Sequence, residues 1–216
     1  MVPGAGAISF ALMASLDWRG LPGLRRNRAG TADAAIGAIP MPAPITTFDQ
    51  QYSDPAATAV EWDDTKRVLA AAELFWVSTV RADGRPHVTP VVAAWVEGAI
   101  WFSTGADEQK FANLRANPHV VLTTGCNRWD QGLDVVVEGD AVQVTDDAVL
   151  SRVAGAFAAK WDGRWQFTVR DGCFRGSDGS GAAMVFSVTP VKVFAHAKGD
   201  PFGATAHRFP GGGQSG

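Results

Sequence analysis

The segment from residue 74 to residue 122 constrains the fold more than any other part of the chain. It reads LFWVSTVRADGRPHVTPVVAAWVEGAIWFSTGADEQKFANLRANPHVVL. Ala82-Asp83-Gly84 and Glu97-Gly98 are turn signals between runs rich in β-branched and aromatic residues, and each supplies a glycine where φ must be positive. This pattern predicts three short strands joined by tight turns.

The strand expected over residues 87–96 has two different faces. Alternation places Val88 and Val92 on one face, and His87 and Thr89 on the other. A purely structural strand would cover its solvated face with Lys, Glu and Thr. A His and a Thr with prolines nearby are more typical of a surface that lines a site.

A helix is predicted after the third strand, over residues 107–116. Ser103-Thr104-Gly105 precedes it, Phe111 and Leu114 supply its buried side, and Asn117-Pro118 stops it. The sequence therefore predicts a strand end, a turn and a helix start in close succession.

Further elements are predicted on both sides of this segment. The pattern indicates a helix over 62–73, a strand over 119–124 and a long strand over 133–144 with a bulge or bend at Glu138-Gly139. A further helix opens at Thr145-Asp146-Asp147, with Thr145 as the N-cap and two acids in the first turn. The core stripe expected for that helix consists of Val149, Leu150, Val153, Ala154 and Phe157.

The last part of the chain is predicted to be less regular. Residues 160–171 are Trp-rich without a clear period, and a final strand over 183–188 and 191–196 is interrupted at Pro190. The stretch that carries His207 and Arg208 is expected to be a mobile tail. Strands dominate in meander order, which predicts a mainly β (α+β) protein: an antiparallel barrel with small helices rather than a doubly wound sheet.

Length and composition predict one domain with two appendages. The chain has 216 residues, of which 46% are apolar, so it can bury one core. Residues 1–45 are rich in Ala, Gly and Pro and are expected to form a disordered extension. The domain is expected over 46–209, followed by a disordered Gly-rich end over 210–216.

Several partner classes are disfavoured by composition. The net charge is −3 and no basic run with interleaved aromatics is present, so nucleic acid is not an expected partner. Cys126 and Cys173 lie far apart without CxxC or His-rich spacing, so neither a disulfide framework nor a metal site is expected. No apolar stretch reaches about 18 residues, which argues against a membrane-spanning helix. A cytoplasmic protein is predicted.

No motif for a catalytic nucleophile, a P-loop, HExxH or paired carboxylates is present. Any enzymatic chemistry is therefore expected to come from a cofactor, and the sequence points to no catalytic residue. Ser103, Thr104, Lys110 and Asn113 gather hydroxyls, a cation and a helix start, which suits a phosphate. The alternative is an ordinary helix cap with a solvated lysine. Gly176–Gly181 (GSDGSG) does not open a helix and is read as a surface loop.

The histidines leave alternatives open. His87 can be a catalytic acid or base, a contact to a ring, or a histidine satisfied at a strand edge. His119 is read as structural. His207 and Arg208 can meet an anionic ligand if their tail folds onto a site, and otherwise lie on the surface.

Four motifs carry a resemblance to a known family: RADGRPHVTPV, WFSTG, QKFANLRANPHVVL and VEGDA. Together they resemble the pyridoxamine 5′-phosphate oxidase-like split β-barrel superfamily, which has the FMN-binding split-barrel fold. The run TTGCNRWDQGLDVVVEGDA is more narrowly similar to the actinobacterial flavin/deazaflavin oxidoreductases of the B group, which use coenzyme F420. The match covers about Asp49 to Phe209.

This resemblance implies a homodimer with two cofactor sites at the subunit interface. The deazaflavin ring would lie along the strand that begins near His87, its phosphate would bind near the helix start, and the loop of Trp129 would approach from the partner subunit. The cofactor-binding residues carried over by position are His87, Val88, Thr89, Pro90, Ser103, Thr104, Lys110, Asn113, Trp129 and Arg208.

Two departures from the family pattern stand out. The chain reads Thr205-Ala206-His207-Arg208-Phe209 where the family often has an Arg after the Thr, and Lys160-Trp161-Asp162-Gly163 where Lys-Tyr-Gly is common. The function that the resemblance implies is an F420-dependent oxidoreductase that transfers a hydride to a conjugated or heteroaromatic small molecule. The alternatives are an FMN-dependent oxidoreductase and a non-catalytic protein that binds a cofactor or a tetrapyrrole.

Overall fold

A computed structural model describes residues 42–176 and 181–210 of the chain. Residues 1–41 of the extension predicted over 1–45, the middle of the GSDGSG loop and the Gly-rich end after residue 210 lie outside these residues. The described part contains three helices: α1 (Trp62–Ala71), α2 (Gln109–Ala116) and α3 (Asp147–Lys160). Its strands are β1 (Ile45–Phe48), β2 (Leu74–Val80), β3 (Pro86–Val96), β4 (Ala99–Gly105), β5 (His119–Thr124), β6 (Gly132–Val144), β7 (Phe167–Arg170), β8 (Cys173–Gly176), β9 (Ala182–Lys198) and β10 (Gly203–Arg208).

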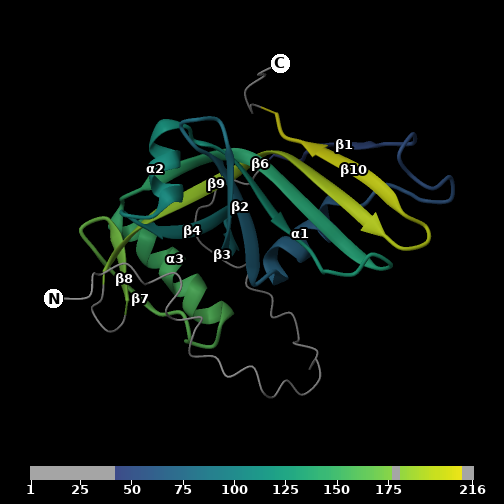
Figure 1. Cartoon of the computed structure of the whole chain (residues 1–216). Helices are drawn as coiled ribbons and strands as arrows, with labels where there is room; N and C mark the ends of the chain where they lie inside the picture. Colours follow the sequence, from purple (N-terminus) through teal and green to yellow (C-terminus); the bar gives the residue numbers. More distant parts are fainter. Residues whose placement is uncertain (1–41, 177–180, 211–216) are drawn as a thin grey trace, which may run out of the picture.

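The central strands close into a six-stranded antiparallel barrel. Their order is β9-β4-β3-β2-β5-β6, and β6 pairs with β9 again to complete the ring. Strand β9 extends beyond the barrel, where it pairs with β10, and β10 pairs with β1. The β7–β8 hairpin joins the other end of β9 through β8 (Figure 1). The prediction of an antiparallel barrel with small helices is confirmed.

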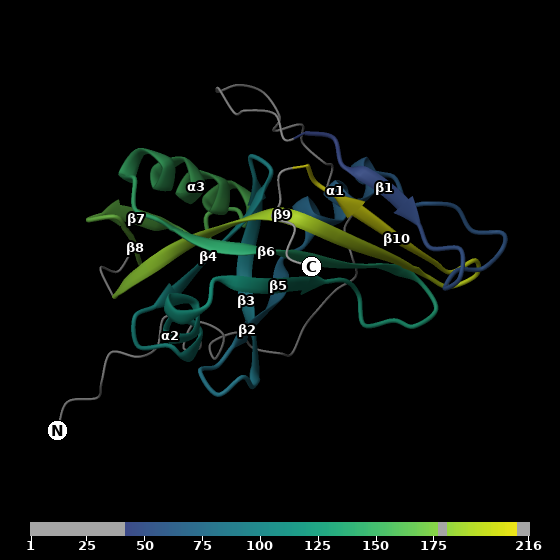
Figure 2. The same ribbon diagram turned by 90° about the horizontal axis from the view of Figure 1, so that it is seen from above.

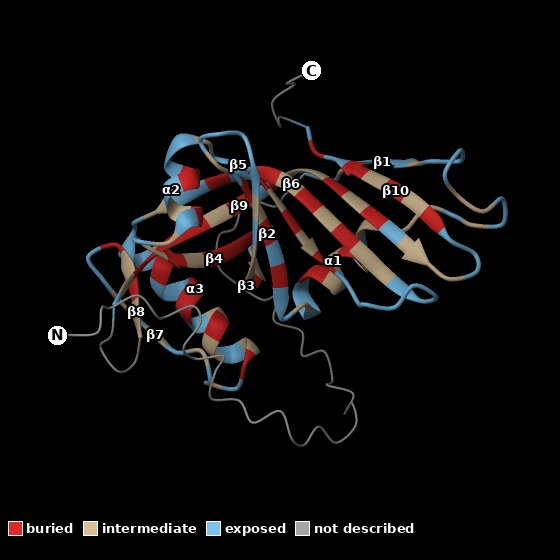
Figure 3. Ribbon diagram, in the orientation of Figure 1, coloured by how far each residue is buried: buried red, intermediate tan, exposed pale blue. Residues whose placement is uncertain are grey.

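Two apolar cores lie on the two sides of the sheet. The first fills the barrel and includes Phe75, Phe102 and Leu122, with Leu69 of α1 and Leu114 of α2 among its members. The second lies between α3 and the outer side of β4 and β9. Figure 2 shows α2 and α3 on opposite sides of β4, and Figure 3 shows the alternation of buried and exposed positions along the strands.

The predicted meander is confirmed with small shifts at its ends. The turns at Gly84 and Gly98 have φ of 84° and 78°, which glycine adopts without strain. The bulge predicted at Glu138-Gly139 is present as a shift in the β6–β9 register. A Cβ atom on Gly139 would lie 2.6 Å from the Thr189 carbonyl oxygen, so the close approach of β9 requires glycine there.

The final strand is longer than predicted. Strand β9 continues through Pro190 instead of being interrupted there, because Pro190 lies opposite Gly139, beside the register shift. A residue without an N–H group is tolerated at such an irregularity. The region predicted to be irregular, 160–171, contains β7, whose Phe167 stacks on Phe174 of β8.

The prediction for the N-cap of α3 was wrong by one residue. Asp146 is the N-cap, and its Oδ1 accepts a hydrogen bond of 2.8 Å from the Val149 amide. The expected core stripe is otherwise confirmed, because Leu150, Val153 and Phe157 are buried against the second core.

The stretch after residue 200 is not a mobile tail, as the sequence had suggested. It forms β10, between β1 and β9, and the His207 ring is fully buried. Its Nδ1 lies 2.9 Å from Thr46 Oγ1 and its Nε2 lies 3.2 Å from Thr65 Oγ1. The ring therefore ties β10 to β1 and α1, because these two threonines come from those elements. Among the described residues, no helix has the length and apolarity needed to cross a membrane.

Candidate functional site

A buried lysine marks the junction between β4 and α2. Lys110 lies in the first turn of α2 and is 3% exposed. Its ammonium forms an ion pair with the Glu108 carboxylate. Burial lowers the pKa of Lys110 to about 8, because a charged group loses hydration inside the protein. The predicted alternative of a solvated surface lysine does not hold.

The Glu108 carboxylate joins the end of β4 to the start of α2. Its Oε2 accepts a hydrogen bond of 3.1 Å from Thr104 Oγ1, and its Oε1 accepts one of 3.3 Å from the Gly105 amide. Together with the Lys110 ammonium, three donors therefore converge on one carboxylate. A hydroxyl, a backbone amide and a cation are the groups that bind anions in proteins, and here the anion is the Glu108 carboxylate.

A second polar network lies next to this cluster, where α2 packs on β2. Asn113 Nδ2 donates to Thr79 Oγ1 at 2.8 Å, and Gln109 Nε2 donates to Asn113 Oδ1 at 2.8 Å. Thr79 Oγ1 lies 3.4 Å from His87 Nδ1. Burial lowers the pKa of His87, and the positive charges of Arg81 and Lys110 lower it further. Both effects favour the neutral form of the His87 ring.

Thr89 presents an unsatisfied hydroxyl on the same side of β3. Its Oγ1 is buried and has no hydrogen-bond partner within the described residues. A buried polar atom without a partner is costly, and such atoms are often found where a ligand or water completes the hydrogen bonding. This position is one that the sequence had selected.

A hollow with an aromatic wall begins at the end of β4 and runs under α3. The wall is formed by Phe157 of α3 and by Trp165 and Phe167, with ring centroids of Phe157 and Phe167 5.6 Å apart. The opposite side of the hollow is formed by the strands β3 and β4. Its lining from these strands and the following turn consists of Pro90, Val91, Val92, Ser103, Thr104, Gly105 and Glu108.

The two hydroxyls that the sequence placed together point to different sides of β4. Thr104 lies opposite Met184, a member of the barrel core, whereas Ser103 lies opposite Val185, a member of the core under α3. Thr104 therefore joins Glu108 and Lys110, and Ser103 lines the hollow. Alternation along β4 separates neighbouring residues in this way.

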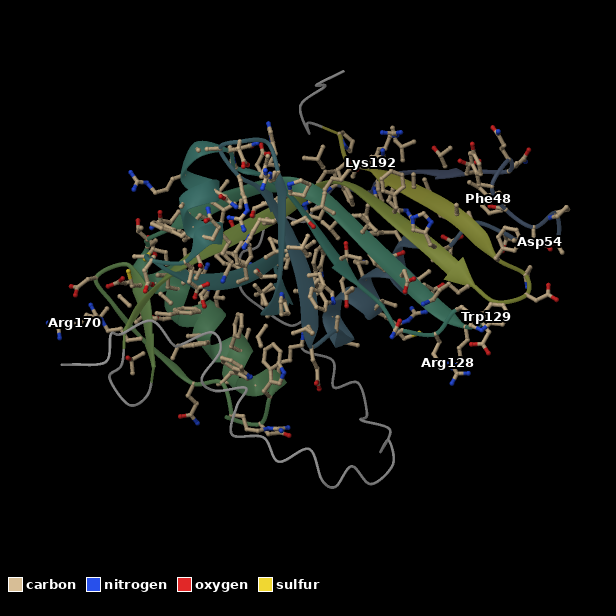
Figure 4. The ribbon with its side chains drawn as sticks, in the orientation of Figure 1. Phe48, Asp54, Arg128, Trp129, Arg170 and Lys192 are labelled. Carbon is tan, nitrogen blue, oxygen red and sulfur yellow. The ribbon has the colours of Figure 1, made fainter. Side chains whose placement is uncertain are left out.

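The other predicted residues are spread over the molecule. Val88 lies on the outer face of β3 and is 51% exposed, and Pro90 lines the hollow. Trp129 is 88% exposed in the loop between β5 and β6, at the end of the molecule away from Arg170 (Figure 4). Arg208 is exposed at the end of β10. The structure thus brings His87, Thr104, Lys110 and Asn113 together and places Trp129 and Arg208 apart from them.

Sequence reasoning missed three side chains of this region. Glu108 binds the predicted phosphate donors, and Trp165 and Phe167 form the aromatic wall. Trp165 and Phe167 lie in the stretch that the sequence showed to be Trp-rich. Their place in the aromatic wall depends on the fold of the β7–β8 hairpin. The only feature of the sequence that pointed to Glu108 was its position three residues after Gly105.

The fold defines a class of protein: a split β-barrel, here with a buried lysine–carboxylate cluster and an adjoining hollow. A family model described as pyridoxamine 5′-phosphate oxidase matches residues 62–197, and the chain belongs to this family. This confirms the superfamily that the sequence motifs had indicated. The narrower assignment to the F420-using group remains a prediction. No curated protein matches the sequence.

Solved structures are similar to this chain at low sequence identity, and the two with TM-scores above 0.5 share its fold. A conserved hypothetical protein from Mycobacterium tuberculosis has a TM-score of 0.54 and 21% identity, covering 65% of this chain and 86% of its own. A candidate 5-nitroimidazole antibiotic resistance protein from Bacteroides thetaiotaomicron has a TM-score of 0.53 and 13% identity, covering 77% and 93%. An F420 reductase has a TM-score of 0.43 and 22% identity, covering 59% and 94%.

Proposed function

We propose that this protein is an F420-dependent oxidoreductase that acts on conjugated or heteroaromatic small molecules. Family membership supports a role in redox chemistry, and the run TTGCNRWDQGLDVVVEGDA supports the deazaflavin group within it. The observation that carries the proposal is the buried Lys110 ammonium beside the Thr104 hydroxyl and the Gly105 amide. These donors would hold the phosphate of the cofactor tail.

The burial of Lys110 fits an anionic cofactor. An ammonium that is 3% exposed has lost most of its hydration, and a charged partner must compensate for that loss. Among the described residues, Glu108 is the one acid that pairs with it. A phosphate offers more acceptor oxygens than a carboxylate, so it can satisfy the same donors.

The strand that the resemblance assigns to the ring has two faces. His87 and Thr89 lie on the barrel side of β3, whereas Val88 and Pro90 lie on its outer side, where the hollow continues from Pro90 towards the aromatic wall. A ring bound along β3 would therefore contact the side chains of one face and the backbone groups of the strand. When bound, the deazaflavin supplies a hydride to an acceptor that lies against its ring. The chain itself binds and orients both molecules and excludes water, and we assign no catalytic residue.

We further propose that the protein works as a homodimer. Four large apolar side chains are exposed on the outer face of β2 and β3: Leu74, Trp76, Val80 and Val88. They share one face, since Ser78 lies opposite Val88 and Trp76 lies opposite Pro90. An apolar face of this kind favours a second copy of the chain. Pro90 belongs to both this face and the hollow, so the partner would close the hollow from outside.

Titration of the purified protein with F420 and separately with FMN tests the proposed cofactor. Quenching of Trp fluorescence gives both dissociation constants. Tight binding of F420 with weak binding of FMN is the expected result. Preference for FMN would assign the protein to the flavin-dependent branch, and binding of neither would refute the proposal.

A turnover assay distinguishes an enzyme from a protein that only carries the cofactor. The protein is loaded with reduced F420 and mixed with quinones, biliverdin-like tetrapyrroles and unsaturated lactones. Oxidation of the cofactor that is faster than in protein-free solution is expected for at least one acceptor. Tight binding without acceleration for any of them would favour the non-catalytic alternative.

A further inference from the structure

The Glu108 carboxylate lies where a bound anion would lie. Its two oxygens are shared among three donors, namely the Thr104 hydroxyl, the Gly105 amide and the Lys110 ammonium. These are also the donors that would bind the cofactor phosphate. The protein therefore supplies its own anion to this site.

We propose that Glu108 is a specificity-determining residue that competes with the cofactor phosphate for these donors and disfavours doubly charged phosphates. The inference rests on the proposed function, because it concerns the same cofactor site. A phosphate gains the three donors only when the Glu108 carboxylate leaves them. Binding of a phosphate must first break the ion pair between Glu108 and Lys110. The affinity for any phosphate is therefore lower by the free energy of that ion pair.

The geometry makes Glu108 the group that moves. Its side chain is 23% exposed, whereas that of Lys110 is 4% exposed. Glu108 is also the N-cap residue of α2, outside the helical turns, and its side chain makes no capping hydrogen bond. Its carboxylate can therefore turn towards water while the Lys110 ammonium stays in place.

The displaced carboxylate remains close to the phosphate, because its backbone is fixed at the helix start. Repulsion between two charges grows with the product of the charges. The monoester phosphate of FMN carries a charge near −2 at neutral pH, whereas a phosphodiester such as that of F420 carries −1. At the phosphate itself, Glu108 therefore penalises the monoester of FMN more than the phosphodiester of F420, and it selects against a dianion at this position.

Glu108→Gln tests this role, because it keeps the shape of the side chain and removes its charge. FMN, riboflavin and F420 are titrated against the wild type and the variant. The dissociation constant for FMN is expected to fall by about tenfold, and that for F420 by less. Riboflavin has no phosphate and is expected to bind both proteins equally.

Asp107→Asn is the matched control. Asp107 is exposed, stands next to Glu108 and carries the same charge near the same helix start. This variant is expected to leave the FMN and F420 constants unchanged. An equal effect of the two substitutions would show general electrostatics and overturn the proposal. So would an unchanged or weaker affinity of the Glu108→Gln variant for FMN.

Binding of inorganic phosphate tests the role of Glu108 without the cofactor. Millimolar phosphate is expected to raise the melting temperature of Glu108→Gln more than that of the wild type or Asp107→Asn, when sodium chloride of equal ionic strength is the reference. Equal shifts in all three proteins would overturn the role of Glu108. If phosphate stabilises the variant but no protein binds F420 or FMN, the proposed function and the cofactor selectivity fail, and only the competition between Glu108 and phosphate stands.

Discussion

Lys110 is the residue on which the candidate site depends most. Its ammonium is buried, its pKa is lowered to about 8, and its carboxylate partner is partly exposed. The flexible stem of a lysine usually lets its ammonium reach water, whereas the Lys110 side chain is 4% exposed. The proposed role of Lys110, which is to hold the phosphate of the cofactor, would explain why the charge is kept inside.

Lys110→Ala is therefore expected to weaken cofactor binding by about 1 to 3 kcal/mol, through the loss of a charge-assisted contact to phosphate. Trp quenching at low salt gives the dissociation constant. Lys66→Ala removes a surface lysine of α1 and is expected to bind as the wild type does. An unchanged constant for Lys110→Ala would exclude Lys110 from the site.

His207 predicts how stability depends on pH. Burial lowers the pKa of His207 below the ordinary value of about 6.5, and both ring nitrogens lie within hydrogen-bonding distance of threonine hydroxyls. Below pH 6.5 the unfolded chain binds a proton that the folded ring resists, so folding stability is full above this pH and falls as the pH drops. Urea unfolding at pH 7.5 and 5.5 measures the loss.

His207→Asn isolates this contribution. The variant is expected to be less stable than the wild type at pH 7.5, because it loses ring contacts to Trp62 and the two threonines. Its stability is expected to change less between pH 7.5 and 5.5. The same pH dependence in both proteins would assign the effect to other groups, such as His87, whose pKa is also lowered.

At the level of elements, the N-cap of α3 shows where sequence and structure differ. Asp146→Ala is expected to destabilise the protein by about 1 kcal/mol, because the Val149 amide loses its acceptor. Thr145→Ala tests the residue that the sequence had favoured and is expected to have a smaller effect. Chemical unfolding of both variants decides between the two caps, and a larger loss for Thr145→Ala would contradict the structure.

The sequence predicted the strands of the meander because their turns and their periodicity are local. The same holds for the bulge at Glu138-Gly139. It missed β10, since GATAHR contains small and polar residues and is specified by its neighbours β1 and β9 rather than by its own pattern. The passage of β9 through Pro190 likewise depends on a partner strand.

The candidate site was predictable in its residue types but not in its geometry. Periodicity made Phe111 and Leu114 the buried side of α2, whereas Lys110 and Asn113 are as buried as Leu114. The pattern of apolar and polar residues cannot predict that a lysine is buried, because burial of a lysine is favourable only with a partner that the fold supplies. The separation of Ser103 from Thr104 followed from strand alternation and was within reach of the sequence.

At the level of the whole molecule, the exposed face of β2 and β3 predicts the oligomeric state. Trp76→Glu is expected to convert a dimer into a monomer and to weaken cofactor binding, because a charge would be buried at the interface. Light scattering coupled to size-exclusion chromatography measures the mass. Val142 is 58% exposed on β6, and Val142→Glu serves as the control that is expected to remain dimeric. A monomeric wild type would refute the proposed dimer.

Strand β9 gives the molecule a particular order of assembly. Its 17 residues pair with β4, β6, β8 and β10, and it follows almost all of the barrel in the chain. During synthesis, β4 and β6 are therefore two unpaired edges until β9 has left the ribosome. Long-range pairing of this kind slows folding and exposes edges that can join other chains. A chain that ends before residue 182 is accordingly expected to aggregate rather than to form a smaller barrel.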